Sequence, residues 1–174
     1  MKKIFYLTNI LLLSSFIFAC APTNINYQNE YDTSKKTWES FKKSTGNSYQ
    51  YTVSNSSWTG ITQQTTITVK KGKVIQREFK QSHPQSSLKE IDNIAWIEKG
   101  KEINTHKNGT EAITLDEVYK KVKNNWLIKR ENAKVYFETK NNGIISTCGY
   151  VEPNCADDCF KGIRITNIKA LTAS

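Results

Sequence analysis

The chain has 174 residues, of which 25 are Lys or Arg and 16 are Asp or Glu, so its formal net charge is +9. This length suits one ordinary domain with a buried core. The basic residues are spread along the chain and form no long run of the kind found in nucleic-acid-binding tails. We therefore expect no nucleic-acid partner, and a basic surface that is either simply solvated or close to anionic envelope components.

The amino terminus has the layout of a signal peptide. Lys2 and Lys3 precede a mostly apolar run from Ile4 to Ala19, and a polar segment follows Cys20. The run is shorter than the roughly 20 apolar residues that a membrane-spanning helix needs. Residues 1–19 are therefore predicted to be a signal peptide, and the chain without them keeps a net charge of +7.

The cleavage region resembles the lipobox of bacterial lipoproteins, with an aliphatic Ile17, a small Ala19 and then Cys20. Phe18 departs from the pattern, because a small residue is commoner there. The resemblance implies a diacylglycerol group, with fatty acyl chains such as palmitate, on Cys20. Two or more such chains anchor a protein stably, at about 0.8 kcal/mol per buried methylene. A plain secretory signal with a chance cysteine is the alternative.

Because of this lipid anchor, we expect the protein to be located in the cell envelope. In lipoproteins of bacteria with two membranes, Asp after the lipidated cysteine favours retention in the inner membrane. Ala21 lacks that signal, so the outer membrane is expected if the organism has two membranes.

The first half of the chain then predicts a tether, a helix and three strands. Residues 20–31 are polar and aperiodic, as a tether would be. A helix is predicted from Asp32, with Trp38 and Phe41 on its apolar face. Alternating apolar and polar residues then predict three strands, with a turn at Lys71-Gly72 before the last, over residues 48–54, 65–69 and 74–79.

The second half predicts another helix and three more strands. Residues 81–109 are less regular, and only Ile91, Ile94, Ala95 and Trp96 indicate a weak helical or short-strand patch. Thr114 and Glu117 are spaced as a capping box, and an apolar stripe continues from there to Trp126. Asn141-Asn142-Gly143 is typical of a type I′ turn. The strands are predicted over residues 134–139, 144–151 and 162–168.

This order of helix, three strands, helix, three strands predicts an α+β fold, with an antiparallel sheet and helices on one face. Residues 32–174 are expected to form a single globular domain.

Several motifs in this order resemble the uncharacterised bacterial family known as the domain of unknown function numbered 6174, found in secreted proteins and lipoproteins. The resemblance covers roughly residues 35–170 and implies a fold but no activity. In that family a cysteine pair often follows the Tyr-x-Tyr strand, whereas Ser54 to Ser57 stand there in this chain. The matching pieces are Trp38, Tyr49-Gln50-Tyr51-Thr52-Val53, Ile67 to Val74, Thr114 to Tyr119, Ala156-Asp157-Asp158 and Ile163 to Asn167.

Three cysteines remain after Cys20, and an exported protein can form disulfides. Cys155 can pair with Cys159, or Cys148 can pair with Cys159 instead, and the sequence does not choose between these. The spacing matches no usual zinc site and is not the Cys-x-x-Cys of redox enzymes, so we expect no metal and no thiol catalysis. Asp157-Asp158 is interpreted as a solvated turn rather than a calcium site.

No catalytic motif is present, and His83 and His106 lie in polar segments without a partner acid or nucleophile at a recognisable spacing. We therefore expect a non-enzymatic module without a cofactor, which is held to a membrane by its lipid and binds an envelope protein or glycan. One alternative is an envelope assembly or inhibitor module, by analogy of fold alone. The other is a hydrolase or thiol-dependent enzyme that uses the His83 to His106 region or the cysteines.

Overall fold

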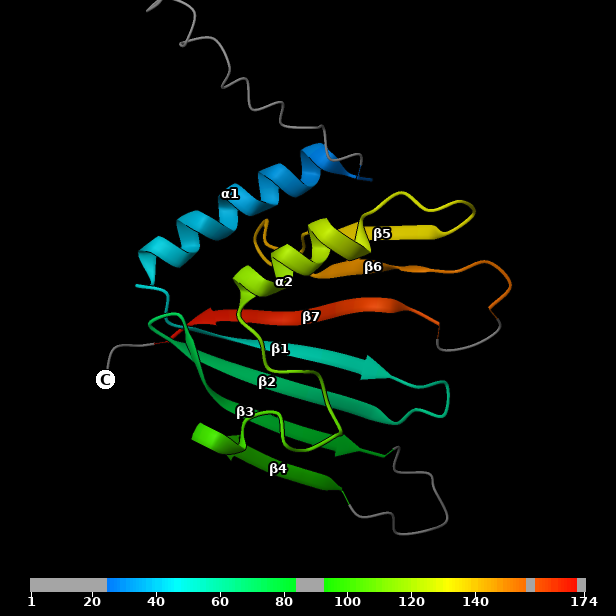
Figure 1. Cartoon of the computed structure of the whole chain (residues 1–174). Coiled ribbons are helices and arrows are strands. Elements are labelled where there is room, and N and C mark those ends of the chain that lie inside the picture. Colours follow the sequence, from blue (N-terminus) through cyan, green and yellow to red (C-terminus); the bar gives the residue numbers. More distant parts are fainter. Residues whose placement is uncertain (1–24, 84–92, 156–158, 172–174) are drawn as a thin grey trace, which may run out of the picture.

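The computed structural model describes residues 25–83, 93–155 and 159–171, which form a mixed α+β fold (Figure 1). Seven antiparallel strands make one sheet in the order β4-β3-β2-β1-β7-β6-β5. The predicted fold class and antiparallel sheet are thus confirmed. Along the chain the elements are α1 (Gln28–Ser44), β1 (Tyr49–Ser56), β2 (Thr62–Lys70), β3 (Lys73–Ser82), β4 (Ile94–Lys99), the 3-10 turn η1 (Gly100–Glu102), α2 (Leu115–Lys121), the π-helical turn η2 (Val122–Trp126), β5 (Lys134–Glu138), β6 (Thr147–Val151) and β7 (Lys161–Ala170).

Helix α1 begins at Gln28, four residues before the predicted start. Ahead of it, Ile25 forms an isolated β-bridge with Ile128, and the backbone N–H of Asn26 donates to the carbonyl of Leu127 at 2.8 Å. The folded structure therefore extends into the segment that was predicted to be a tether. These tertiary contacts order a stretch whose own sequence shows no periodicity.

Strands β1 to β3 form the meander that the sequence predicts. The turn between β2 and β3 places Lys71 at φ 50° and Gly72 at φ 76°, as a type I′ hairpin turn requires. Tyr49 and Tyr51 are completely buried on one side of β1, and the polar residues that alternate with them, Gln50 and Thr52, lie on the other side.

Strand β4 lies where the sequence indicates only a weak helical or short-strand patch, and it changes the order to helix, four strands, helix, three strands. It pairs with β3 at the edge of the sheet. The one fully buried side chain of β4 is Glu98, whereas Ile94 and Ile97 are exposed. This is the reverse of the usual burial pattern, so hydrophobic periodicity could not reveal the strand.

The start of α2 is confirmed as a capping box. The Thr114 hydroxyl accepts the Glu117 N–H, and the Glu117 carboxylate accepts the Thr114 N–H at 2.7 Å. The predicted apolar stripe is also confirmed, because Leu115, Val118 and Tyr119 are buried. The helix then widens into η2, whose Val122 is buried as well.

The turn predicted between β5 and β6 forms, but the strand predicted to return from it is shorter. Asn142 and Gly143 both have positive φ, at 52° and 85°, and Asn141 pairs with Ile144 across the turn. Ile144 and Ile145 then leave the sheet and are buried in the core, so β6 begins only at Thr147.

The core joins both helices to the sheet. The ring centroids of Trp38 on α1 and Tyr49 on β1 lie 4.9 Å apart, and the Trp38 ring also stacks on Tyr119 of α2. The Tyr119 hydroxyl is 2.7 Å from the Ser34 hydroxyl of α1. The predicted core position of the Trp38 stripe is confirmed.

Candidate functional site

The sheet divides at one end, between its two central strands. The pairing of β1 with β7 stops at Val53 and Ile165, after an irregularity between Thr52 and Val53. Beyond this point β1 continues to Ser56 paired only with β2, and the first residues of β7 pair only with β6. Two hairpins therefore part from a common sheet, and both lie at the same end of the molecule (Figure 1).

A hollow of about 940 Å³ opens where these strands separate. We call it the β1–β7 hollow. Its volume is in the range of ligand-binding sites. Most of its lining carries hydroxyl, amide or guanidinium groups, and the apolar part comes from Ile61, Val151 and Phe160. The polar side chains include Ser54, Ser56, Gln63, Gln81, Arg164 and Thr166.

Phe160 is seated against a pair of facing glycines. Gly149 of β6 lies opposite Gly162 of β7. A Cβ atom on residue 149 would come within 2.6 Å of Cζ of Phe160, so the ring occupies the space that a side chain there would need. A glycine inside a strand often marks such a close approach. The aromatic ring of Tyr136 meets Phe160 edge-on, with centroids 6.0 Å apart.

Arg164 lies over Phe160. Its guanidinium carbon is 3.8 Å from the centroid of the ring, in a cation–π arrangement. Ile163 and Ile165 on either side of it are buried, so the alternation along β7 turns Arg164 away from the core. Within the part of the chain that the structure describes, its guanidinium makes no hydrogen bond and no ion pair.

A second hollow of about 310 Å³ is also lined by this pair. It shares Val151, Phe160 and Arg164 with the β1–β7 hollow and adds Tyr136, Glu138 and Thr147. Arg164 and Phe160 therefore line both hollows.

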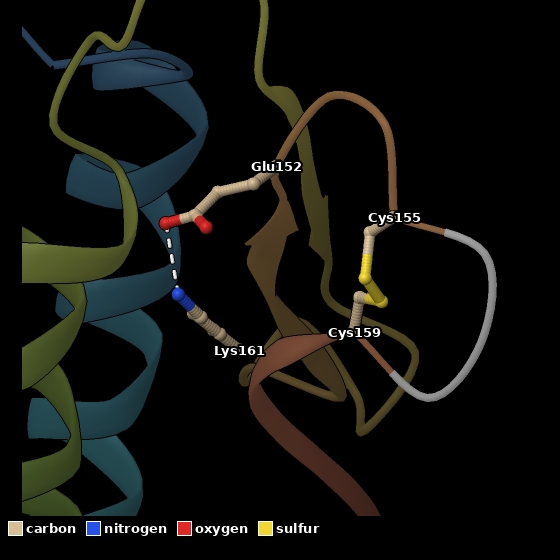
Figure 2. The surroundings of a disulfide bond; sticks show 4 residues. All are labelled: Glu152, Cys155, Cys159 and Lys161. Atoms are coloured by element: carbon tan, nitrogen blue, oxygen red, sulfur yellow. Dashed lines mark hydrogen bonds and ion pairs between the residues drawn. A yellow bond between two sulfur atoms is a disulfide. The ribbon is translucent and has the colours of Figure 1, made fainter.

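The loop that leads to Phe160 is closed by a disulfide between Cys155 and Cys159, whose Cα atoms are 6.1 Å apart. At the base of the same loop, Nζ of Lys161 lies 2.8 Å from Oε1 of Glu152 (Figure 2). Both cysteines line the β1–β7 hollow. This bridge is the first of the two predicted pairings. The alternative with Cys148 does not form, because Cys148 is a free thiol buried in the core.

Trp58 lies at the tip of the β1–β2 hairpin and is 84% exposed. Its neighbour Ser57 lines the hollow, as does Ile61. The tip is held by backbone hydrogen bonds from Ser57 to Ile61 and from Gly60 to Ser57, at 2.9 and 3.0 Å. A large aromatic side chain is thus presented to solvent by an ordered turn.

His106 has an acidic partner that the sequence did not reveal. Its Nδ1 is 2.9 Å from Oε1 of Glu98, and its ring stacks on Trp96 with centroids 4.3 Å apart. Glu98 is also paired with Arg77, whose Nη1 lies 3.1 Å from its Oε2. His106 is exposed over 51% of its side chain, and its partner acid lies eight positions earlier in the chain, on β4.

The electrostatics of Glu98 follow from this setting. Burial raises its pKa, but hydrogen bonds from the backbone and ring of His106, from the Asn104 N–H and from Arg77 lower it more, to about 2. Arg77 in addition donates to the carbonyls of His106, Asn108 and Thr110. The pair therefore holds the connection between β4 and α2 in place, which is a structural task.

The remaining residues that the sequence singled out do not form a site with one another among the described residues. His83 bonds to Gln81 through Nε2 at 3.2 Å. Residues 1–19, Cys20 and Asp157-Asp158 lie outside the described residues. Among those that are described, no cluster of three His, Cys, Asp or Glu side chains could hold a metal ion. No helix in the described ranges is both long and apolar enough to cross a membrane.

The chain matches no protein-family model, no curated protein and no solved structure.

Proposed function

We propose that this protein is a lipoprotein anchored to the cell envelope through Cys20, whose domain binds another envelope component, a protein or a glycan, without catalysing a reaction. The observation that carries the binding part is the guanidinium of Arg164. It is held over Phe160 beside a hollow and has no acceptor among the described residues.

The anchor rests on the sequence around Cys20 and on its short distance from the fold. Four residues separate Cys20 from Ile25, where the described structure begins. At about 3.3–3.6 Å per residue, the five steps reach at most about 18 Å. The domain of the acylated protein therefore stays close to the membrane surface. The outer membrane is the proposed location if the organism has two.

The arrangement of the helices is also part of the proposal, as is membership of the family numbered 6174. Both helices are taken to cover one face of the sheet. Trp38, Tyr119 and Tyr49 support this, because α1, α2 and β1 meet in one cluster. The polar residues of β1 that face away from this cluster, such as Gln50 and Thr52, are then left for solvent or a partner.

Replacing Cys20 by Ser tests the anchor. The variant should lose its acyl chains and leave the membrane fraction, whereas a Cys148→Ser variant, changed at a core cysteine, should stay there. An unchanged membrane fraction for Cys20→Ser contradicts the anchoring proposal.

A photo-reactive diazirine residue at Ser56 tests the binding site in living cells. Ser56 lies beside the β1–β7 hollow, and Lys70 at the opposite end of the same hairpin is the matched control position. We expect one discrete adduct from residue 56, absent from residue 70 and lost when Arg164 is changed to Ala. Equal adducts from both positions contradict a binding site in the hollow.

A hydrolase that uses His106 is the second candidate, because Glu98 orients its ring as an acid orients a catalytic base. No Ser, Thr or Cys side chain among the described residues is hydrogen bonded to the ring of His106. Turnover of a cell-wall or phosphoester substrate by the purified protein, lost in a folded His106→Ala variant, would establish this candidate in place of the first.

A further inference from the structure

We propose that the β1–β7 hollow binds an acidic glycan, with Arg164 on the carboxylate or phosphate of the glycan and the surrounding hydroxyl and amide groups on its sugar hydroxyls. This inference rests on the proposed binding function and adds the chemical class of the ligand.

The acidic group is inferred from Arg164. A guanidinium presents several N–H donors in a planar fork that matches two oxygens of a carboxylate or phosphate. The Arg164 group packs over the Phe160 ring, and its N–H donors have no acceptor among the described residues. Ordering this side chain before binding reduces the entropy that binding costs.

Among the described residues, no carboxylate forms an ion pair with this guanidinium. Glu138, which lines the smaller hollow, is 3.0 Å from Nζ of Lys140, and Glu152 is paired with Lys161. The formal charge of the whole chain is also strongly positive. An anionic ligand is therefore favoured both at the site and over the longer range.

The sugar is inferred from the rest of the lining. A peptide ligand would need pockets for apolar anchors, whereas most of the side chains around this hollow are small or polar. They can both donate and accept hydrogen bonds, as sugar hydroxyls do. These side chains belong to strands β1, β2, β3 and β7. They are Ser54, Asn55, Ser56, Gln63, Gln81 and Thr166.

Trp58 adds an aromatic surface beside Ser57, which lines the hollow. Its exposed indole can cover the apolar C–H face of a sugar ring, and backbone hydrogen bonds order the turn that carries it. The size of the hollow, about 940 Å³, suits a short oligosaccharide.

Calorimetry on the mature lipoprotein in a nonionic detergent tests the inference. The first pair of probes is a galacturonic acid trimer and the neutral galactose trimer of the same linkage. The second pair is a mannose trimer with a terminal phosphate and the same trimer without the phosphate. Inorganic phosphate is the fifth probe. We expect at least one acidic trimer to bind with a Kd about tenfold or more below that of its neutral match. Preference for galacturonate or for the phosphorylated trimer identifies the acidic group. Added salt should weaken this binding.

Variants locate the binding. Arg164→Ala should remove the preference for the acidic trimer, Arg164→Lys should keep part of it, and Lys70→Ala should leave it unchanged. Arg164 is exposed, so its replacement should not disturb folding, which circular dichroism checks. Trp58→Phe should remove the change in tryptophan fluorescence that the acidic trimer causes in the parent protein.

Three results would overturn the inference. They are equal affinity for acidic and neutral trimers, inorganic phosphate binding as tightly as the phosphorylated trimer, and failure of both acidic trimers to bind. If in these cases residue 56 still forms an adduct that depends on Arg164, the proposed binding function stands and only the ligand class is wrong.

Discussion

Nη1 of Arg77 on β3 lies 3.1 Å from Oε2 of Glu98 on β4, and the two side chains are only 2% and 1% exposed. Glu98 also accepts the backbone N–H groups of Asn104 and His106, both at 2.7 Å. The pair thus links the edge strand to the segment that leads into α2. A buried pair of this kind destabilises a protein strongly when one partner is removed, because the other is left as an uncompensated charge.

Replacing Arg77 by Met should therefore lower the free energy of unfolding by about 3–5 kcal/mol. Urea denaturation of the Cys20→Ser protein, which carries no lipid, measures the effect. The matched control is the exposed pair of Lys121 and Glu111, where Lys121→Met should cost less than about 1 kcal/mol. Equal costs for both variants would contradict the structural role of the buried pair.

Glu98 should also make the stability depend on pH. Its pKa is lowered from 4.5 to about 2 in the folded protein, so the ionised form is favoured by folding. This contribution is fully present above pH about 4.5 and is lost as the pH falls toward 2. Unfolding free energies at pH 7, 5, 4 and 3 should therefore fall more steeply below pH 5 in the parent protein than in Glu98→Gln. Parallel pH profiles would refute the assignment.

The hydroxyl of Tyr51 should contribute to the free energy of unfolding. It donates a 2.6 Å hydrogen bond to the carbonyl of Ile113, just ahead of α2, and its side chain is buried. Tyr51→Phe leaves that carbonyl without its partner and should cost about 1–3 kcal/mol. Tyr136→Phe is the control, since the Tyr136 hydroxyl makes no hydrogen bond within the described ranges, and it should change stability by less than about 0.5 kcal/mol. Thermal unfolding of both variants checks this.

Cys148 should be unreactive in the folded protein. Its thiol is buried, and burial raises its pKa, so the reactive thiolate is not formed at ordinary pH. With iodoacetamide at pH 8, the Cys20→Ser protein should gain no adduct when native and one adduct when unfolded without reductant. Mass spectrometry after reduction should add two more, from Cys155 and Cys159. An adduct on native Cys148 would contradict its burial.

Local sequence rules account for much of the fold. The capping box of Thr114 and Glu117 is confirmed because both partners lie within one helical turn. The β1–β2–β3 meander and its turn at Lys71-Gly72 are confirmed because alternation and backbone preferences also act over a few residues. The antiparallel α+β class follows from the order of these elements.

The parts that were missed depend on distant residues. The residues next to Glu98 in the chain do not indicate that it pairs with Arg77. Arg77 lies 21 positions earlier and contacts Glu98 only when β3 and β4 pair. A buried charge inverts the pattern that identifies a strand, so β4 was not recognised. Ile25 and Asn26 are similarly ordered by contacts with residues about a hundred positions away.

The candidate site shows the same division. By itself, the sequence predicted a lipobox around Cys20 and offered two pairings for the cysteine bridge, because these patterns are local. Only the tertiary structure selected Cys155 with Cys159, buried Cys148 and placed Arg164 over Phe160 beside the β1–β7 hollow. The hollow exists because β1 and β7 stop pairing at Val53. These strands lie far apart in the chain, so no local sequence pattern predicts where they separate.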